Sequence, residues 1–138
     1  MHKMTIVTVI VAGLLATLAV TAFTSVHVPQ GSTSVSLKVG QCLRNYTAAA
    51  YPDHVSGHWT SGSECLQGRA HAVCQEPIGG PAHVFDGGWV VSQQNDTANC
   101  KSPYINVEKA AWQSRSGPGG AVTTCWFYDN GPIQTYCT

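Results

Sequence analysis

The chain has 138 residues, in which seven Lys or Arg are balanced by seven Asp or Glu, and only 10% of all residues are charged. This length suits one domain rather than two. The charge balance provides neither a basic field for phosphates nor an acidic field for cations, so the composition argues against a nucleic-acid partner.

Residues 1–23 predict an export segment, because an uncharged apolar run follows Lys3. Small residues at Val20 and Ala22 fit the two positions that signal peptidase recognises, which would allow cleavage after Ala22. The run also approaches the ~20 residues that cross a bilayer, so residues 5–23 would act as a membrane anchor if they are not removed. Both alternatives place the rest of the chain outside the cytoplasm.

Residues 24–34 read as a linker rich in Ser, Gly and Gln, and residues 35–138 as a single extracytoplasmic domain. The first strand is predicted at residues 35–39, where apolar and polar side chains alternate. Residues 44–68 are rich in Ser, Thr, Gly and His, contain Pro52, and show no sustained period of 2 or 3.6 residues. This stretch is predicted to be a long loop.

Short apolar segments separated by Gly and Pro then predict strands at residues 71–75, 82–86 and 87–93. The segment 102–112 is ambiguous, because Ser102 could cap a helix that has Pro103 in its first turn, whereas residues 104–109 alternate as in a strand. We predict a strand there, followed by a loop at residues 114–120. Frequent punctuation by turn residues indicates a mainly β fold: a small disulfide-stapled sandwich or partly open barrel of short antiparallel strands.

The last predicted element is a hairpin formed by residues 123–129 and 133–137 around the turn residues "DNGP". A three-residue loop at 130–132 would pair Asp129 with Ile133, and the same register would place Cys125 opposite Cys137. Trp126 would then face Tyr136 on the other side of the hairpin. The register therefore favours a disulfide between Cys125 and Cys137.

Six cysteines lie in the exported part, an even number that predicts three disulfides in an oxidising compartment. None of them forms the close Cys-x-x-Cys pair that is typical of zinc sites, so we expect no metal and no cofactor. Six cysteines allow 15 connectivities, which spacing alone does not resolve. The six are Cys42, Cys65, Cys74, Cys100, Cys125 and Cys137.

Histidines supply the candidates for chemistry. His54 and His58 have a helical metal-site spacing, but Pro52 and the nearby glycines oppose a helix, so we interpret them as solvated loop residues. His71 or His83, with Asp86 close by, could serve a small hydrolase. No Gly-x-Ser-x-Gly elbow accompanies them, so a catalytic role is the weaker interpretation.

Aromatic side chains supply a candidate binding surface. Four tryptophans could form a face on which sugars stack, or they could fill a small β core. The sequences "NYT" at Asn45 and "NDT" at Asn95 match the glycosylation acceptor, which matters only in a eukaryotic secretory route. The four tryptophans are Trp59, Trp89, Trp112 and Trp126.

Four motifs carry a resemblance to a known family. "LKVGQC" at residues 37–42, "HAVCQEP" at 71–77, "NCKSPY" at 99–104 and "TTCWF" at 123–127 resemble small actinobacterial envelope proteins of the septum-formation/LppU-like type. The resemblance implies an N-terminal membrane segment, a compact cysteine-paired outer domain and no catalytic residues.

The resemblance also implies its own cysteine pairing, of Cys42 with Cys74 and Cys100 with Cys125, which leaves Cys65 for Cys137. This pairing competes with the hairpin register. The function expected from sequence is a non-enzymatic binding module at the cell envelope or outside the cell, with an unknown protein or carbohydrate ligand. A secreted effector, toxin or inhibitor is the first alternative, because small stapled domains tolerate oxidising fluids. The hydrolase that uses His71 or His83 is the second.

Overall fold

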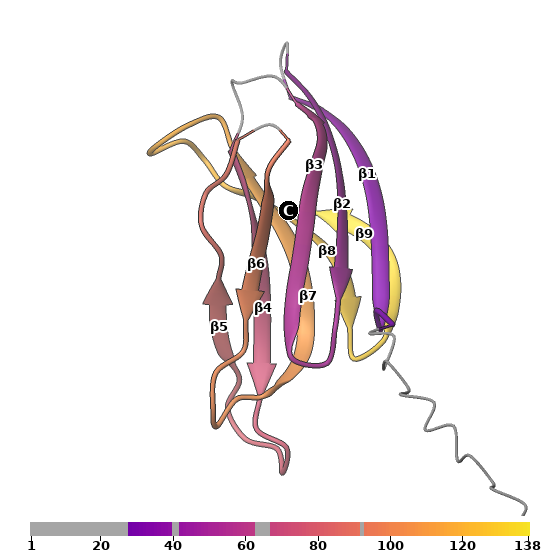
Figure 1. Cartoon of the computed structure of the whole chain (residues 1–138), viewed down its shortest axis with the longest axis vertical. Coiled ribbons are helices and arrows are strands. Elements are labelled where there is room, and N and C mark those ends of the chain that lie inside the picture. The colour runs from indigo at the N-terminus through magenta and orange to yellow at the C-terminus, as the bar shows by residue number, and fades with distance from the viewer. Residues whose placement is uncertain (1–27, 40–41, 63–66, 92) are drawn as a thin grey trace, which may run out of the picture.

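A computed structural model describes residues 28–39, 42–62, 67–91 and 93–138 (Figure 1). Nine strands and no helix are found in this part of the chain, and it accordingly contains no helix able to cross a membrane. The predicted export segment at residues 1–23, including the anchor at 5–23, lies outside the described residues.

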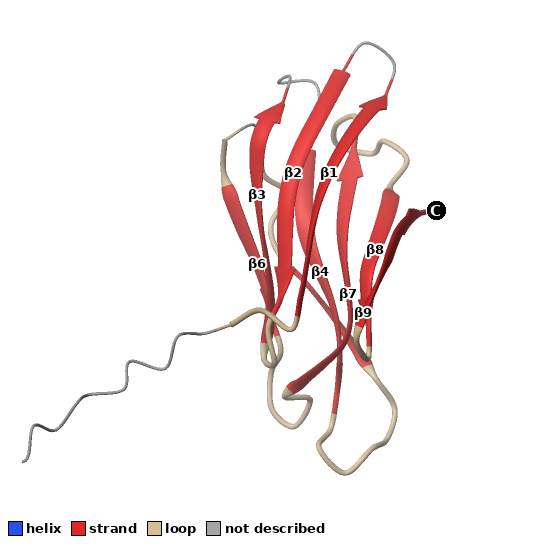
Figure 2. Cartoon of the chain, turned by 90° about the vertical axis from the view of Figure 1, so that its right-hand side faces the viewer, coloured by secondary structure: helices blue, strands red, loops and turns tan. Residues whose placement is uncertain are grey.

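The strands form two antiparallel sheets whose strands run along the long axis of the domain (Figures 1 and 2). The four-stranded sheet has the order β1 (Gly31–Val39), β2 (Cys42–Ala50), β3 (His54–Gly62) and β6 (Asn95–Asn99). The five-stranded sheet has the order β5 (His83–Asp86), β4 (Gln67–Gln75), β7 (Asn106–Arg115), β8 (Thr123–Asp129) and β9 (Pro132–Cys137). The predicted fold class, a small disulfide-bonded β sandwich, is confirmed.

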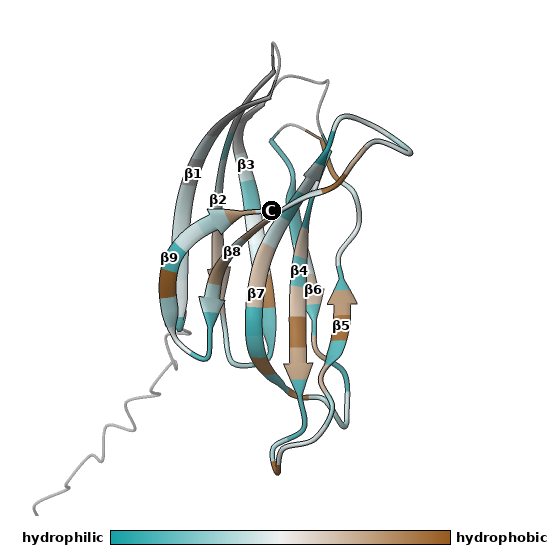
Figure 3. Ribbon diagram, turned by 180° about the vertical axis from the view of Figure 1, so that it is seen from behind, coloured by the Kyte–Doolittle hydropathy of each residue, from teal (hydrophilic) through white to brown (hydrophobic). Residues whose placement is uncertain are grey.

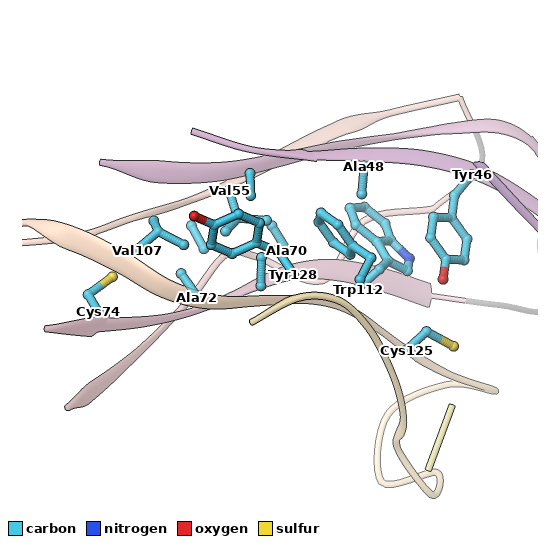
Figure 4. Packing of buried hydrophobic residues seen from close by; sticks show 14 of the residues in the cluster. Tyr46, Ala48, Val55, Ala70, Ala72, Cys74, Val107, Trp112, Cys125 and Tyr128 are labelled. Carbon is cyan, nitrogen blue, oxygen red and sulfur yellow. The ribbon is translucent and has the colours of Figure 1, made fainter. Parts of the chain in front are cut away.

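The core lies between the two sheets, where alternate residues of each strand meet (Figure 4). Its largest members are aromatic: Tyr46 of β2 stacks on Trp112 of β7, with ring centroids 5.4 Å apart, and Trp59 of β3 meets both rings edge-on. All three side chains are almost fully buried. Each aromatic side chain of this kind buries roughly 150 to 250 Å² and so contributes strongly to the stability of a small core.

Two glycines make room for these rings. Gly57 of β3 faces Trp112, and Gly68 of β4 faces both Trp59 and Trp112, so that a Cβ atom at either position would overlap an indole ring. Glycine is needed here for close approach, because each indole lies against backbone. Small residues on one sheet thus complement large residues on the other.

The long loop predicted at residues 44–68 is wrong, because β2 and β3 occupy most of it. The period of two was present, but Ala48, Ala50 and Gly57 fill core-facing positions that hydropathy does not mark as apolar. Pro52 lies in a tight turn, across which the amide of Tyr51 donates to the carbonyl of His54 at 2.8 Å.

Other boundaries also differ from the prediction. Strand β1 begins at Gly31, so the predicted linker 24–34 ends inside a strand. The strand predicted over 102–112 exists as β7, but it begins only at Asn106 and continues to Arg115 into the predicted loop. The segment 87–93 contributes one bridge between Val90 and Gly68 rather than a strand. Strand β6 was not predicted, because Ala98 is its one buried residue.

Covalent and polar links join the two sheets. Cys74 of β4 is bonded to Cys100, which directly follows β6, with Cα atoms 5.8 Å apart. The Asp96 carboxylate of β6 accepts hydrogen bonds from the amide of Ala70 on β4 at 2.7 Å and from the amide of Gly88 at 2.9 Å. These links hold one edge of the sandwich together.

The C-terminal hairpin joins Cys125 to Cys137, as its predicted register favoured. Trp126 also pairs with Tyr136, but Tyr128 pairs with Pro132, so the predicted pairing of Asp129 with Ile133 is wrong. A bulge absorbs the difference, and Asn130 and Gly131 adopt positive φ angles in the turn. A β-bulge places unequal numbers of residues on the two strands, which shifts the register of the hairpin.

The cysteine pairing implied by the family resemblance is wrong at each described bond. Cys74 pairs with Cys100 rather than Cys42, and Cys125 pairs with Cys137 rather than Cys100. The antiparallel pairing of β8 and β9 places Cys125 opposite Cys137, so these two form a bond. Cys100 is bonded to Cys74 of β4 instead. The side chains of Cys42 and Cys65 lie outside the described residues.

Candidate functional site

The four tryptophans do not form one surface. Trp59 and Trp112 are core residues, so their predicted role in an exposed binding face is wrong. Each lies on the side of its strand that packs against the opposite sheet. Trp89 and Trp126 instead lie on the solvent side of the five-stranded sheet and are half-buried. Sequence alone did not separate these pairs, because which face of a strand is buried depends on what the opposite sheet packs against it.

A row of side chains crosses the solvent side of the five-stranded sheet. The strand register places Asp86, His71, Ala111, Trp126 and Tyr136 beside one another on β5, β4, β7, β8 and β9. Ala111 is fully buried even though it belongs to this outer row. Its neighbours therefore close over it: the imidazole of His71 meets the indole of Trp126 edge-on, with centroids 5.4 Å apart.

Hydrogen bonds fix the first part of this row. The Nδ1 atom of His71 lies 2.6 Å from Oδ1 of Asp86, and the other carboxylate oxygen lies 3.0 Å from a guanidinium nitrogen of Arg69. Because a carboxylate oxygen accepts, Nδ1 carries the proton, and the Nε2 atom of a neutral ring is left as an acceptor. The side chain of His71 is 10% exposed.

An arginine cluster adjoins the row. The guanidinium carbons of Arg69 and Arg115 lie 4.5 and 4.1 Å from the centroid of the Trp89 ring, within the range of cation–π attraction. Arg69 also donates to Gln113 at 2.8 Å, and Arg115 donates to Gln67 at 2.8 Å. Each side chain of the cluster therefore has its orientation fixed by at least one neighbour.

We define the outer aromatic face as the solvent side of the five-stranded sheet around this row and cluster. Sequence reasoning missed the two arginines, although their spacing held a signal: Gln67, Arg69 and His71 alternate with core residues along β4. The face consists of Arg69, His71, Asp86, Trp89, Arg115, Trp126 and Tyr136.

The arrangement supplies two parts of a hydrolase triad at most. His71 and Asp86 meet as a catalytic pair would, but among the described residues no serine or threonine hydroxyl is hydrogen-bonded to His71. His83 does not join the pair, because its ring stacks on Tyr104 with centroids 4.6 Å apart. A triad would in addition need a nucleophile within hydrogen-bond reach of the imidazole.

His54 and His58 lie on strand β3, so the predicted loop position is wrong. In a strand, four residues span about 13 Å, which is too far for two imidazoles to ligate one ion. Each ring instead has a neighbouring acceptor: Asp53 lies 2.7 Å from Nδ1 of His54, and the amide oxygen of Asn95 lies 2.6 Å from Nδ1 of His58.

A protruding loop joins β4 to β5 at residues 76–82. Its tip carries Ile78, which is 93% exposed, and Figure 3 shows the tip as an apolar spot at the end of the domain. Internal hydrogen bonds link Gly79 to Glu76 and Gln75 to Gly80. The disulfide from Cys74 anchors the base of this loop to the other sheet.

The solvent side of the four-stranded sheet differs in chemistry. Most of its described side chains are hydroxyls, amides and imidazoles, which alternate with the core residues of β1, β2, β3 and β6. A shallow hollow of about 480 Å³ lies on this side, over β1, β2 and β3. We call this side the outer hydroxyl face: Ser32, Ser34, Thr47, Ala49, Tyr51, His54, Ser56, His58, Asn95, Thr97 and Asn99.

Comparison with known proteins gives no family to which the chain can be assigned: no family model, no curated protein and no solved structure matches it. Function is therefore argued from the two outer faces and the disulfide-bonded fold.

Proposed function

We propose that this chain is an exported binding module without catalytic activity, and that it binds a protein partner at the cell envelope through the outer aromatic face. The observation that carries the proposal is the gathering of Trp126, Tyr136, Trp89 and two arginines on one side of one sheet. Tyrosine, tryptophan and arginine are the residues that most often dominate binding energy at protein interfaces.

Preorganisation supports a protein interface over an ordinary solvated surface. Arg69 and Arg115 are held by Gln113, Gln67, Asp86 and the Trp89 ring, so little side-chain entropy would be lost on binding. Tyr136 is 51% exposed and lies beside Trp126, which gives the face an open aromatic edge. Such an edge can enter a pocket of a partner while the arginines pair with its polar groups.

Export is supported by the two disulfides among the described residues, since such bonds are typical of oxidising compartments. The resemblance of the cysteine motifs to septum-formation/LppU-like envelope proteins points to the same location. The apolar run at residues 5–23 would provide either a cleaved signal or the attachment to the membrane.

Site-specific photocrosslinking in cells that export the full chain tests the proposal. A benzophenone side chain at position 136 should give a covalent adduct that protease removes and glycosidase does not. The same probe at position 97, on the outer hydroxyl face, is the matched control and should give none. Failure of position 136 to crosslink, or equal adducts from both positions, would contradict a protein interface on the outer aromatic face.

A second variant identifies the residue that drives binding. With the probe moved to Val84, which is exposed on β5 at the opposite edge of the same sheet, Trp126→Ala should reduce the adduct at least tenfold. Thr124→Ala, at the next outward position of the same strand, should leave it within twofold.

One observation favours a secreted inhibitor or effector as the second candidate. Ile78 stands at the tip of a loop that is tied at its base by the disulfide from Cys74, the geometry of a side chain presented to another protein. Crosslinking from position 78 but not from position 136 would favour this function over the first.

A further inference from the structure

We propose that the hollow of the outer hydroxyl face is a binding site for a neutral carbohydrate chain. The proposal concerns the opposite sheet from the proposed protein interface, so the two can fail separately. It rests on the shape of the hollow, on the chemistry of its lining and on the orientation of its side chains.

The shape follows from the strand register. One cross-strand row consists of small residues only, Ser32 on β1, Ala49 on β2 and Ser56 on β3. The neighbouring row on one side contains Tyr51, and the row on the other side contains Thr47 and His58. The small row therefore forms the floor of a groove that crosses the strands, and the larger side chains form its walls.

The dimensions fit a chain-like ligand. Two intervals between neighbouring strands make the floor about 10 Å long, and the walls are separated by four residues, about 13 Å of strand. The hollow has a volume of about 480 Å³, within the roughly 300 to 1,000 Å³ of small-molecule sites, and it is open to solvent. An open groove admits a segment of a longer polymer.

The lining selects for a neutral polar ligand. Among the described residues that line the hollow there is no Asp, Glu, Lys or Arg, and no aliphatic side chain larger than Ala. Hydroxyls of Ser32, Ser34, Thr47 and Ser56 can both donate and accept, as the hydroxyls of a sugar require. An extended peptide would instead need pockets for apolar side chains, which the described lining does not provide.

Two side chains of the walls are already oriented. The Nδ1 atom of His58 donates to the amide oxygen of Asn95 at 2.6 Å, so the Nε2 atom of the neutral ring is an acceptor for a ligand hydroxyl. At the other wall, the ring of Tyr51 stacks on His54, with centroids 4.4 Å apart and planes 12° from parallel. Flat aromatic rings offer an apolar face for the C–H groups of a sugar.

Titration of the purified full chain with neutral oligosaccharides, followed by amide chemical shifts in NMR spectra, tests the proposal. Neutral gluco- and manno-oligosaccharides are the probes, and oligogalacturonate is the anionic comparison. We expect saturable shifts centred on Ala49 and Ser56 with at least one neutral probe, and at least fivefold weaker binding of the anionic one. Absence of saturable shifts with every neutral probe, or stronger binding of the anionic chain, would overturn the proposal.

A matched pair of variants locates the site. Ser56→Tyr fills the floor and should weaken binding at least tenfold. Thr97→Tyr lies in the same cross-strand row on β6, beyond the hollow, and should leave binding within twofold. If Ser56→Tyr does not fold, Ser32→Tyr fills the same floor from edge strand β1. Retained binding in a folded floor-filled variant would place the ligand elsewhere.

Discussion

The two outer faces of the sandwich share an architecture and differ in side-chain size. On the outer hydroxyl face, Ser32, Ala49 and Ser56 leave a groove open. On the outer aromatic face, the corresponding central position, Ala111, is covered by His71 and Trp126. One small residue in the middle of a sheet thus gives a hollow or a closed surface, according to the size of its cross-strand neighbours.

The difference also concerns how each face contributes to stability. Side chains of the aromatic face cover one another and form ion pairs, hydrogen bonds and ring contacts, so they add to folding as well as to any binding. Hydroxyls of the other face exchange bonds with water at little net gain. Substitutions on the aromatic face should therefore cost more than equivalent ones on the hydroxyl face.

The largest effect is expected from cutting the link between the sheets that carry the two faces. Replacing Cys74 and Cys100 together by Ala should lower the free energy of unfolding by about 3.5 kcal/mol, as expected for a loop of 26 residues. Replacing Cys125 and Cys137 together by Ala should lower the free energy of unfolding by about 2.8 kcal/mol, because this disulfide closes a loop of only 12 residues within one sheet. Urea unfolding of both double variants measures the order, and a larger loss for the within-sheet pair would contradict it.

The second prediction concerns Gly57, whose backbone borders the groove on one side and the Trp112 ring on the other. Gly57→Ala should destabilise the domain by about 3 kcal/mol, since the added methyl group must displace an indole in a close-packed core. Ser56→Ala, one residue away but pointing outward, should stay within about 0.5 kcal/mol of the wild type. Similar unfolding midpoints for the two variants would contradict this prediction, because they would show that the core accommodates the methyl group without loss of stability.

Third, Trp126→Ala should lower the free energy of unfolding by about 2 kcal/mol, because a half-buried ring is lost and Ala111 becomes exposed. Ser34→Ala on the hydroxyl face should have an effect below about 0.5 kcal/mol. Thermal unfolding of both variants tests whether side chains of the aromatic face contribute more to stability than those of the hydroxyl face. Equal losses would remove the distinction between the faces.

The smallest effect is expected at Asp86. Asp86→Asn should cost about 1 kcal/mol, because its carboxylate serves both His71 and Arg69 in a partly buried setting. Asp129→Asn breaks a more exposed pair, 3.6 Å from Lys109, and should cost less than about 0.5 kcal/mol. Denaturant unfolding at low and high salt distinguishes the two ion pairs. Added salt should reduce the stability loss caused by Asp129→Asn more than that caused by Asp86→Asn, because the exposed pair is screened more strongly.

Local sequence determined the parts of this protein that depend on short-range pattern and covalent spacing. The β class followed from short apolar segments between Gly and Pro. The bond between Cys125 and Cys137 followed from the spacing of two cysteines about one hairpin turn. The bulge between Trp126 and Tyr128, which shifts Asp129 away from Ile133, was not predicted, because the register argument assumed regular alternation on both strands.

Tertiary structure alone decided which residues are core and which are surface. Gly57 and Gly68 are buried because the side chains of Trp112 and Trp59, respectively, pack on them from the opposite sheet. The sequence around each glycine does not indicate this contact. The same packing removed two tryptophans from the predicted binding face and left Trp89 and Trp126 on it. Strands β2 and β3 were missed for this reason: Ala48, Ala50 and Gly57 interrupt their inward apolar pattern, and the burial of these small residues depends on large residues that lie far away in sequence.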